Sequence, residues 1–397
     1  MEIKVGNIIT EEWQNILKDR RLFAVLLIVP IIYTAMFGYL YSSNRVQDLS
    51  TLIVDHDKSQ MSREIIQAFD ETSTLQVTGH YDSEADVKKM LATSQARVAI
   101  IIPNHFSERI KDGDTEPILT LIDGSNMLIS NAATRAANEV VATVSAGIGT
   151  EKIQKQGSRL EEAMGTFQSV PFRSRILYNP TFNYSEFLVY GLIGAVLQQV
   201  LLLGIALTVT RDKESGMWQR FAAWREVPWR IAYAKTAPYF LIGLFNTLST
   251  LLVAVYGFHL PLNSVLWPVF LISISFTFAL LGIGYFASLL SANQVGATQV
   301  TMLIAVPSFL LSGFTWPFEA MPQALNVLGH LLPLTYFLDG VRHLFVKGND
   351  LSVVLNDVIV LGLMGLVTFF IAFLISSTQR FWHGKKDVQT QDNQLSV

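Results

Sequence analysis

Side chains able to do acid–base or metal chemistry are few in this chain, and their spacing matches no known site. His330, Asp339 and His343 share one segment, but the nine and thirteen residues from His330 to the other two are no recognised metal-ligand spacing. An Asp-His-Asp triplet at residues 55–57 follows an apolar run, where carboxylates ordinarily cap a turn. A metal site is the weaker alternative in both places, so we expect neither a metal ion nor a catalytic residue.

Sequence motifs of nucleotide and hydrolase chemistry are absent from the 397 residues. There is no G-x-x-x-x-G-K-[ST] phosphate loop, no H-E-x-x-H zinc motif and no G-x-S-x-G nucleophile motif. The chain has no cysteine, which excludes disulfides, thiolate metal ligands and a cysteine nucleophile. The chain itself is therefore not expected to bind ATP through a phosphate loop.

Charged and aromatic residues gather in one polar loop, predicted at residues 210–235, which interrupts an apolar second half. From Arg211 it reads RDKESGMWQRFAAWREVPWRIAYAK, with six basic residues, three acidic residues and three tryptophans. A short basic loop between two membrane spans is expected on the cytoplasmic face, where a soluble partner could bind it. Tryptophans prefer the membrane interface, so we expect Trp218, Trp224 and Trp229, together with Trp13, to be interfacial anchors.

The apolar residues on both sides of this loop predict an α-helical polytopic membrane protein. Half of the chain is hydrophobic and 15% is charged, against about 25% in a typical soluble protein. The first predicted span, residues 22–42, has no charged residue, covers about 30 Å as a helix and contains Pro30, which should kink it. It follows a charged segment and is too long for a signal peptide, so we expect it to be retained. Five further spans, six transmembrane helices in all, are predicted at residues 186–209, 231–258, 266–290, 294–312 and 353–376.

The segments around the spans complete the predicted layout. Residues 1–21 carry apolar side chains at helical spacing, which predicts an amphipathic interfacial helix. Residues 43–185, between the first and second spans, alternate strand-like and helix-like patterns, which predicts a small α/β domain of four strands. Residues 186–376 hold the other five spans and a proline-broken element, re-entrant or interfacial, at residues 313–350. A polar tail is predicted at residues 377–397.

Basic residues indicate the orientation of the chain in the membrane. Lys18, Arg20 and Arg21 directly precede the first span, and the polar loop and the tail are also rich in lysine and arginine. Segments with such an excess remain in the cytoplasm. Because six spans bring both termini to one face, we expect cytoplasmic termini and an extracytoplasmic α/β domain.

Neutral polar side chains interrupt the predicted spans. Gln198 and Gln199 lie midway along the second span, and Asn246 lies in the third. Residues of this kind either bond helices or subunits together or line a path for a transported molecule. The span centres carry no charged residue, which argues against a proton-driven or ion-driven transporter.

Three short motifs stand in an order that covers nearly the whole chain. Residues 97–103 read Arg-Val-Ala-Ile-Ile-Ile-Pro, residues 211–216 read Arg-Asp-Lys-Glu-Ser-Gly, and residues 311–317 read Leu-Ser-Gly-Phe-Thr-Trp-Pro. Together they resemble the ABC-2 type permeases, the membrane subunits of bacterial ABC exporters, and in particular their drug-exporter branch. In that family R-[ED]-K-E-x-G follows the second span. The chain departs from the family at residues 217–219, Met-Trp-Gln, where Thr-Leu-Glu is common.

The resemblance implies a half-transporter of the bacterial inner membrane. Two such subunits, identical or paralogous, would pair in the lipid, each with a separate cytoplasmic ABC ATPase that binds ATP and Mg²⁺. Arg211, Lys213, Glu214 and Gly216 would couple the ATPase to the spans, and the three neutral polar residues of the spans would meet the substrate. That substrate would be an amphipathic drug-like or lipid-like molecule leaving the cytoplasm or inner leaflet. The α/β domain would gate exit or engage an outer adaptor, and no nucleic acid partner is expected.

Two other classes of protein compete with this interpretation. A membrane-anchored receptor or assembly protein would bind its ligand through the α/β domain, but six spans and a broken element exceed what anchoring requires. An intramembrane enzyme would need paired carboxylates or histidines inside the spans, and the span centres have neither. Co-purification of a phosphate-loop ATPase distinguishes the first interpretation from both.

Overall fold

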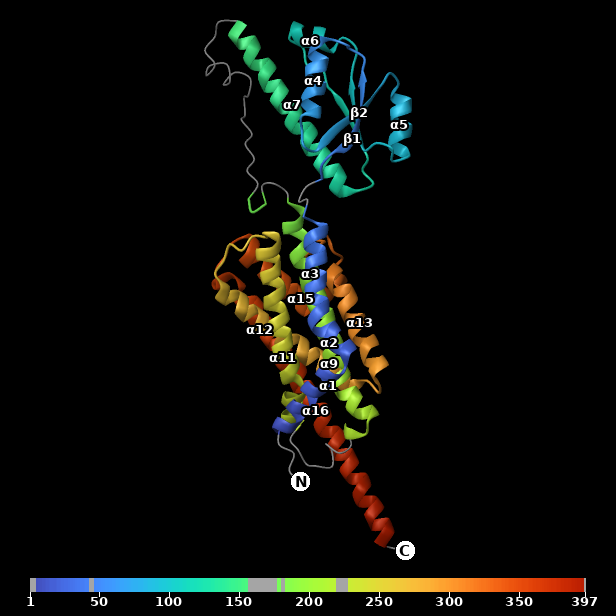
Figure 1. Cartoon of the computed structure of the whole chain (residues 1–397), viewed down its shortest axis with the longest axis vertical. Coiled ribbons are helices and arrows are strands. Elements are labelled where there is room, and N and C mark those ends of the chain that lie inside the picture. The colour runs from blue at the N-terminus through green and yellow to red at the C-terminus, as the bar shows by residue number, and fades with distance from the viewer. Residues whose placement is uncertain (1–4, 43–45, 156–176, 180–182, 219–227, 396–397) are drawn as a thin grey trace. The chain divides into compact units, whose positions relative to one another are not determined.

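A computed structural model describes residues 5–42, 46–155, 177–179, 183–218 and 228–395, without the side chains of residues 150–155 and 379–395. Within these residues six helices are long and apolar enough to cross a membrane, which confirms the expected polytopic architecture (Figure 1). They are Arg20–Leu40, Tyr184–Glu214, Pro228–Gly257, Leu266–Leu290, Gln294–Leu311 and Leu351–Thr378. The chain divides into a helical unit, Met1–Ser42 with Leu177–Val397, and a second unit, Ser43–Ile176.

The first span is built from several helical pieces. The amphipathic helix α1 (Val5–Lys18) ends at Asp19, whose side chain accepts hydrogen bonds from the first amides of α2 (Arg20–Phe23). A π-helical turn, Ala24–Ile28, then leads into α3 (Val29–Leu40). The irregular turn ends two residues before Pro30, where the sequence predicted a kink. Proline has no amide to donate to the carbonyl four residues back, and that carbonyl, of Leu26, lies within the turn.

Helix α9 (Tyr184–Glu214) is the most enclosed span. In its most apolar stretch 67% of the residues are buried, compared with 22% in the fifth and sixth spans. It packs against α3, α11 (Pro228–Leu252), α12 (Leu266–Leu290) and α13 (Gln294–Leu311). A π-helical turn, Val253–Gly257, closes the third span. Gly284 of α12 lets the two helices approach closely, because a Cβ at this position would overlap Cγ2 of Ile205 on α9.

Short helices fill the predicted broken element between the fifth and sixth spans. They are the 3-10 turn Phe318–Ala320, α14 (Gln323–His330), α15 (Pro333–Val341) and the π-helical turn Arg342–Val346. Prolines 317, 322 and 333 stand at the starts of three of these pieces, where a missing amide costs least. Helix α16 (Leu351–Leu395) follows, and its backbone stays helical through the predicted polar tail because no proline interrupts it.

The second unit contains a four-stranded sheet with the order β2-β1-β3-β4, as many strands as the sequence predicted. Three strands run parallel, β1 (Leu49–Asp55), β2 (Leu75–Tyr81) and β3 (Val98–Ile102), and β4 (Leu119–Ile122) pairs antiparallel with β3. The strands are connected by α4 (Gln60–Asp70), α5 (Glu84–Ala92) and α6 (Phe106–Asp112), and α7 (Met127–Lys155) follows β4. Helices α4, α6 and α7 share one apolar core with the sheet, and α5 covers the other face.

The acidic triplet after β1 makes turns and caps, as predicted. The Asp55 carboxylate accepts hydrogen bonds from the amides of Asp57 and Lys58 and from the Ser62 hydroxyl. The Asp57 carboxylate accepts from the amide of Ser107 at the start of α6. Burial raises the pKa of Asp57, but hydrogen bonds from Ser59 and Ser107 outweigh it, so the net pKa lies below the usual value.

Candidate functional site

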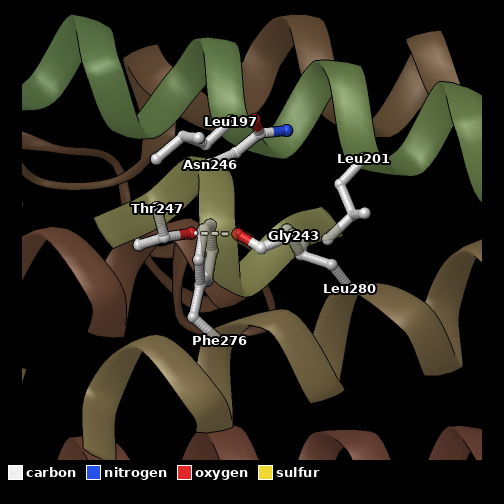
Figure 2. Close-up of a pocket in the computed structure, with 7 residues that line it drawn as sticks. All are labelled: Leu197, Leu201, Gly243, Asn246, Thr247, Phe276 and Leu280. Atoms are coloured by element: carbon white, nitrogen blue, oxygen red, sulfur yellow. Dashed lines mark hydrogen bonds between the residues drawn. The ribbon is translucent and has the colours of Figure 1, made fainter. Parts of the chain in front are cut away.

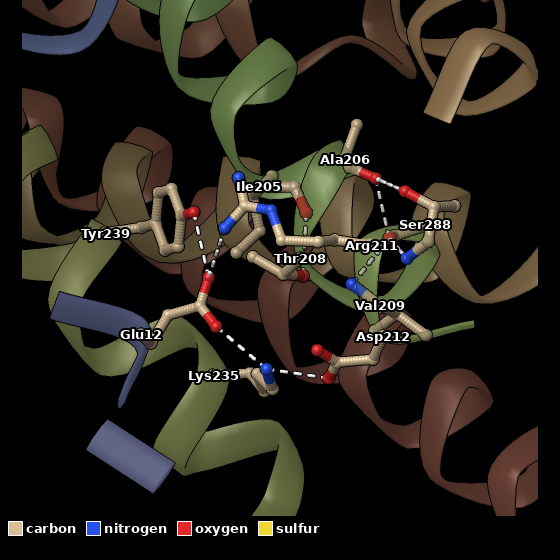
Figure 3. A network of polar contacts seen from close by, with 11 residues as sticks. Glu12, Ile205, Ala206, Thr208, Val209, Arg211, Asp212, Lys235, Tyr239 and Ser288 are labelled. Atoms are coloured by element: carbon tan, nitrogen blue, oxygen red, sulfur yellow. Dashed lines mark hydrogen bonds and ion pairs between the residues drawn. The ribbon is translucent and has the colours of Figure 1, made fainter. Parts of the chain in front are cut away.

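Ionised side chains from three helices meet where α9 ends. Lys235 of α11 places its Nζ 2.8 Å from Oε2 of Glu12 on α1 and 2.6 Å from Oδ2 of Asp212 on α9 (Figure 3). The three residues are only 1%, 0% and 5% exposed. Tyr239 donates to the other Glu12 oxygen at 3.0 Å, and Arg211 lies 3.7 Å from that oxygen. Two acids and two bases give no net charge, which is what allows such a group to be buried.

Lys213 reaches a different neighbour, the last turn of α12. Its Nζ donates to the backbone carbonyls of Leu289 and Ser291 at 2.6 and 2.8 Å, with that of Ser288 at 3.4 Å. The last carbonyls of a helix have no partner inside it and carry the negative end of its dipole. A lysine is therefore a well-matched cap, and it holds the ends of α9 and α12 together.

Glu214 reaches a third neighbour, the first turn of α13. Its Oε1 accepts from the Gln294 amide at 2.8 Å, and its other oxygen accepts from the Gln294 side chain. The Asn293 side chain caps the same helix by accepting from the amide of Gly296. A carboxylate suits this place, because the amides at a helix start are unpaired and the dipole is positive there.

Consecutive residues of α9 thus contact four different helices. Successive side chains on a helix are rotated by about 100°, so four in a row sweep most of the circumference. Arg211 faces α1, Asp212 faces α11, Lys213 faces α12 and Glu214 faces α13. We call these four residues, together with Glu12 and Lys235, the charged junction. It lies where α9 and α12 end and α11 and α13 begin, at one end of the bundle.

A serine reinforces the contact of α9 with α12. The Ser288 hydroxyl donates to the carbonyl of Ala206 at 2.6 Å and accepts from the amides of Val209 and Thr210 (Figure 3). Those groups belong to the backbone hydrogen-bond ladder of α9 itself. The hydroxyl therefore inserts into that ladder, which holds the two helices at a fixed register.

Beyond Glu214 the helix stops. Ser215 is the last αR residue, and Gly216 has a φ of +75°, the left-handed conformation that glycine adopts most readily at a helix end. Gly216 is thus a helix terminator, whereas Arg211, Lys213 and Glu214 bond to neighbouring helices of the same chain. Of the predicted anchors, Trp13 and Trp218 are half-buried against the spans, Trp229 is 56% exposed, and Trp224 lies outside the described residues.

The three neutral polar residues do not face one place. Gln198 and Asn246 are buried within the bundle, whereas Gln199 is exposed on its outer surface. The Asn246 side chain donates to the carbonyl of Leu26, the carbonyl that Pro30 leaves without its usual amide. Asn246 thereby ties the third span to the irregular turn of the first.

The residues of the broken element are also divided. The His330 ring bonds the carbonyl of Asn326 and lies against the Phe318 ring, tilted by 34°, while His343 lies 3.8 Å from Asp339. No group of three metal-binding side chains occurs among the described residues.

The sequence indicated neither Glu12 nor Lys235 as members of a site, although a lysine at the start of an apolar run was a usable signal. The sequence pattern also gave no indication that Asp357 of α16 would be buried, and its side chain is only 7% exposed.

The fold and the charged junction define a multi-pass helical membrane protein whose spans are tied together at one end. Residues 20–374 match the family model described as ABC-2 family transporter protein, and the chain belongs to that family. This makes it the membrane subunit of an ABC transporter.

Three relatives from Escherichia coli K12 match almost end to end. The probable multidrug ABC transporter permease YbhS is 27% identical over 385 residues, 95% of this chain and 97% of its own. The probable multidrug ABC transporter permease YbhR is 23% identical over 354 residues, 89% of this chain and 93% of its own. The inner membrane transport permease YhhJ is 24% identical over 380 residues, 93% and 96%.

Proposed function

We propose that the chain is the permease of an ATP-driven exporter that moves an amphipathic, drug-like or lipid-like molecule out of the cytoplasm or inner leaflet. A separate ATPase subunit would bind ATP and Mg²⁺, and two permease copies or paralogues would pair. The observation that carries this proposal is the charged junction, in which four consecutive residues of α9 bond four other helices. Such a junction transmits a push on any one of these helix ends to the others.

The burial of Lys235, Glu12 and Asp212 supports the mechanical role of the charged junction. Separating Lys235 from Glu12 and Asp212 would leave charges unpaired where water is excluded, so α1, α9 and α11 favour moving together. Residues 217–227 join α9 to α11 in the sequence and closely follow the charged junction. In this proposal the partner binds there, and Arg211, Lys213 and Glu214 carry its motion inward.

The proposed orientation of the chain in the membrane rests on the residues at this same end of the bundle. Helix α1 and the carboxyl end of α16 lie at one end of the helical unit (Figure 1). Lys18, Arg20 and Arg21 are exposed beside the first span, which favours a cytoplasmic location for that end. With six spans, the residues of the four-stranded sheet would then lie outside the cytoplasm, where they could gate exit or bind an outer adaptor.

The proposed substrate class rests on the names of the relatives and on the apolar character of the spans. Two of the relatives carry the words probable multidrug in their names. The six candidate spans are apolar, and Gln198 and Asn246 are buried between them at 0% and 3% exposure. In this proposal the two amides meet a substrate with polar parts only after the helices separate.

The test is purification of the tagged chain from its own membranes in mild detergent. We expect a phosphate-loop ATPase to co-purify, and its ATP hydrolysis to be stimulated by the chain and further by amphipathic compounds. If no such ATPase co-purifies, or if its rate of ATP hydrolysis is the same with and without the chain, the proposal is wrong.

A further inference from the structure

A small pocket lies at the middle of the bundle, between α9, α11 and α12 (Figure 2). Leu197, Leu201, Phe276 and Leu280 give it apolar walls, and Asn246 of α11 adds a polar one. These residues stand near the midpoints of the second, third and fourth spans, so the pocket lies near the centre of the bilayer. It has room for about one water molecule.

Four polar side-chain atoms near the level of this pocket have no hydrogen-bond partner among the described residues, and one of them belongs to the pocket wall. They are Oδ1 of Asn246, Oγ1 of Thr277, and both Oε1 and Nε2 of Gln198. The three side chains are 3%, 0% and 0% exposed. The amide nitrogen of Asn246 is already engaged with the carbonyl of Leu26, so its oxygen is the atom left over.

The register of α9 on α12 brings the other two side chains to the same level. The helices run parallel, Ile205 lies against Gly284, and Val209 bonds Ser288. Both pairs are offset by the same number of residues, and that offset places Gln198 opposite Thr277. The Thr277 methyl in turn faces Gly243 on the pocket wall, because a Cβ there would lie 2.8 Å from it.

We propose that one resident water molecule occupies this pocket and bonds Asn246, Gln198 and Thr277. The unpaired groups include two acceptor oxygens, a hydroxyl and an amide donor, and a water molecule offers two donors and two acceptors. Bulk water does not reach the bilayer centre to form hydrogen bonds with these groups, and an amide left without a hydrogen bond there is strongly disfavoured. Buried waters are held by two to four polar partners of this kind. The water joins α9, α11 and α12 at mid-membrane through a ligand that can change partners when the helices shift.

The direct test is X-ray radiolytic labelling of the full chain in detergent, read by mass spectrometry. Hydroxyl radicals formed from a bound water oxidise the buried side chains beside it. We expect Phe276, on the pocket wall, to be oxidised several-fold faster than Phe345, which is equally buried at 1% exposure but lies elsewhere. Equal oxidation of the two rings would overturn the proposal.

A second measurement uses variants that differ by one hydroxyl. If water bonds Thr277, Thr277→Val loses a hydrogen bond and lowers the melting temperature at least as much as Thr208→Val, whose hydroxyl bonds the carbonyl of Ile205. If the pocket is dry, Thr277→Val removes an unpaired hydroxyl and raises the melting temperature instead. A raised melting temperature of the Thr277→Val protein therefore contradicts the proposal.

Discussion

Lys235→Met tests the central ion pairs of the charged junction. The substitution keeps most of the side-chain volume but leaves the carboxylates of Glu12 and Asp212, both at most 5% exposed, without their shared partner. Removing one partner of a buried pair typically destabilises a protein by about 3–5 kcal/mol. A protein of about 150–250 residues loses roughly 2–4 °C of melting temperature per kcal/mol. The helical unit is slightly larger, so about 2 °C per kcal/mol applies and the expected loss is about 5–10 °C.

The assay is thermal unfolding in detergent or nanodiscs, followed by tryptophan fluorescence. Lys88→Met is the matched control, because its pair with Glu84, at 3.4 Å, is 60% and 43% exposed, and such surface pairs contribute about 0.5 kcal/mol or less. Adding Asp212→Asn to Lys235→Met should restore much of the loss, because the remaining carboxylate, Glu12, still has Arg211 as an ion-pair partner. A Lys235→Met protein that melts with the Lys88→Met control would refute the reasoning.

Two further predictions concern other contacts. Asn246→Leu should destabilise the chain by about 1–3 kcal/mol, because the Leu26 carbonyl loses its hydrogen-bond donor. The loss should be smaller in a Pro30→Ala background, where the amide of residue 30 can bond that carbonyl. A double-mutant cycle by thermal unfolding measures this coupling, and strictly additive effects of the two substitutions would contradict the prediction. Because the pKa of Asp57 is lowered in the folded state, its stabilisation is complete above about pH 4 and is lost as pH falls through the folded value. Asp57→Asn should therefore flatten the acid dependence of hydrogen exchange in α6, and an unchanged acid limb would argue against it.

Hydropathy and local patterns were sufficient to predict the elements of this fold. Apolar length identifies all six spans, and the alternating pattern of residues 49–122 identifies four strands, because both depend on neighbours close in sequence. The prolines of the broken element act locally too, which is why its position was predictable.

The charged junction depends on contacts that no local pattern contains. Glu12 and Lys235 are 223 residues apart, and their pairing depends on how α1 packs against α11. The motif at residues 211–216 drew attention to Lys213 and Glu214 through resemblance alone. That their bonds run to the ends of α12 and α13 could not be read from the sequence, since it reflects helix packing rather than periodicity. Asn246 illustrates the same limit, because its partner is defined by a proline in another span.

The most direct test of the proposed coupling role is Glu214→Ala in the reconstituted complex with its ATPase. Losing a helix-capping carboxylate costs about 1 kcal/mol, too little to unfold the chain, and Glu319→Ala, an exposed acid in the broken element, is the control. ATP hydrolysis and movement of a fluorescent amphipathic compound are measured together in proteoliposomes. We predict that the Glu214→Ala protein retains hydrolysis but loses most of its transport per ATP, while the Glu319→Ala protein keeps both. Unchanged transport per ATP in the Glu214→Ala protein would contradict it.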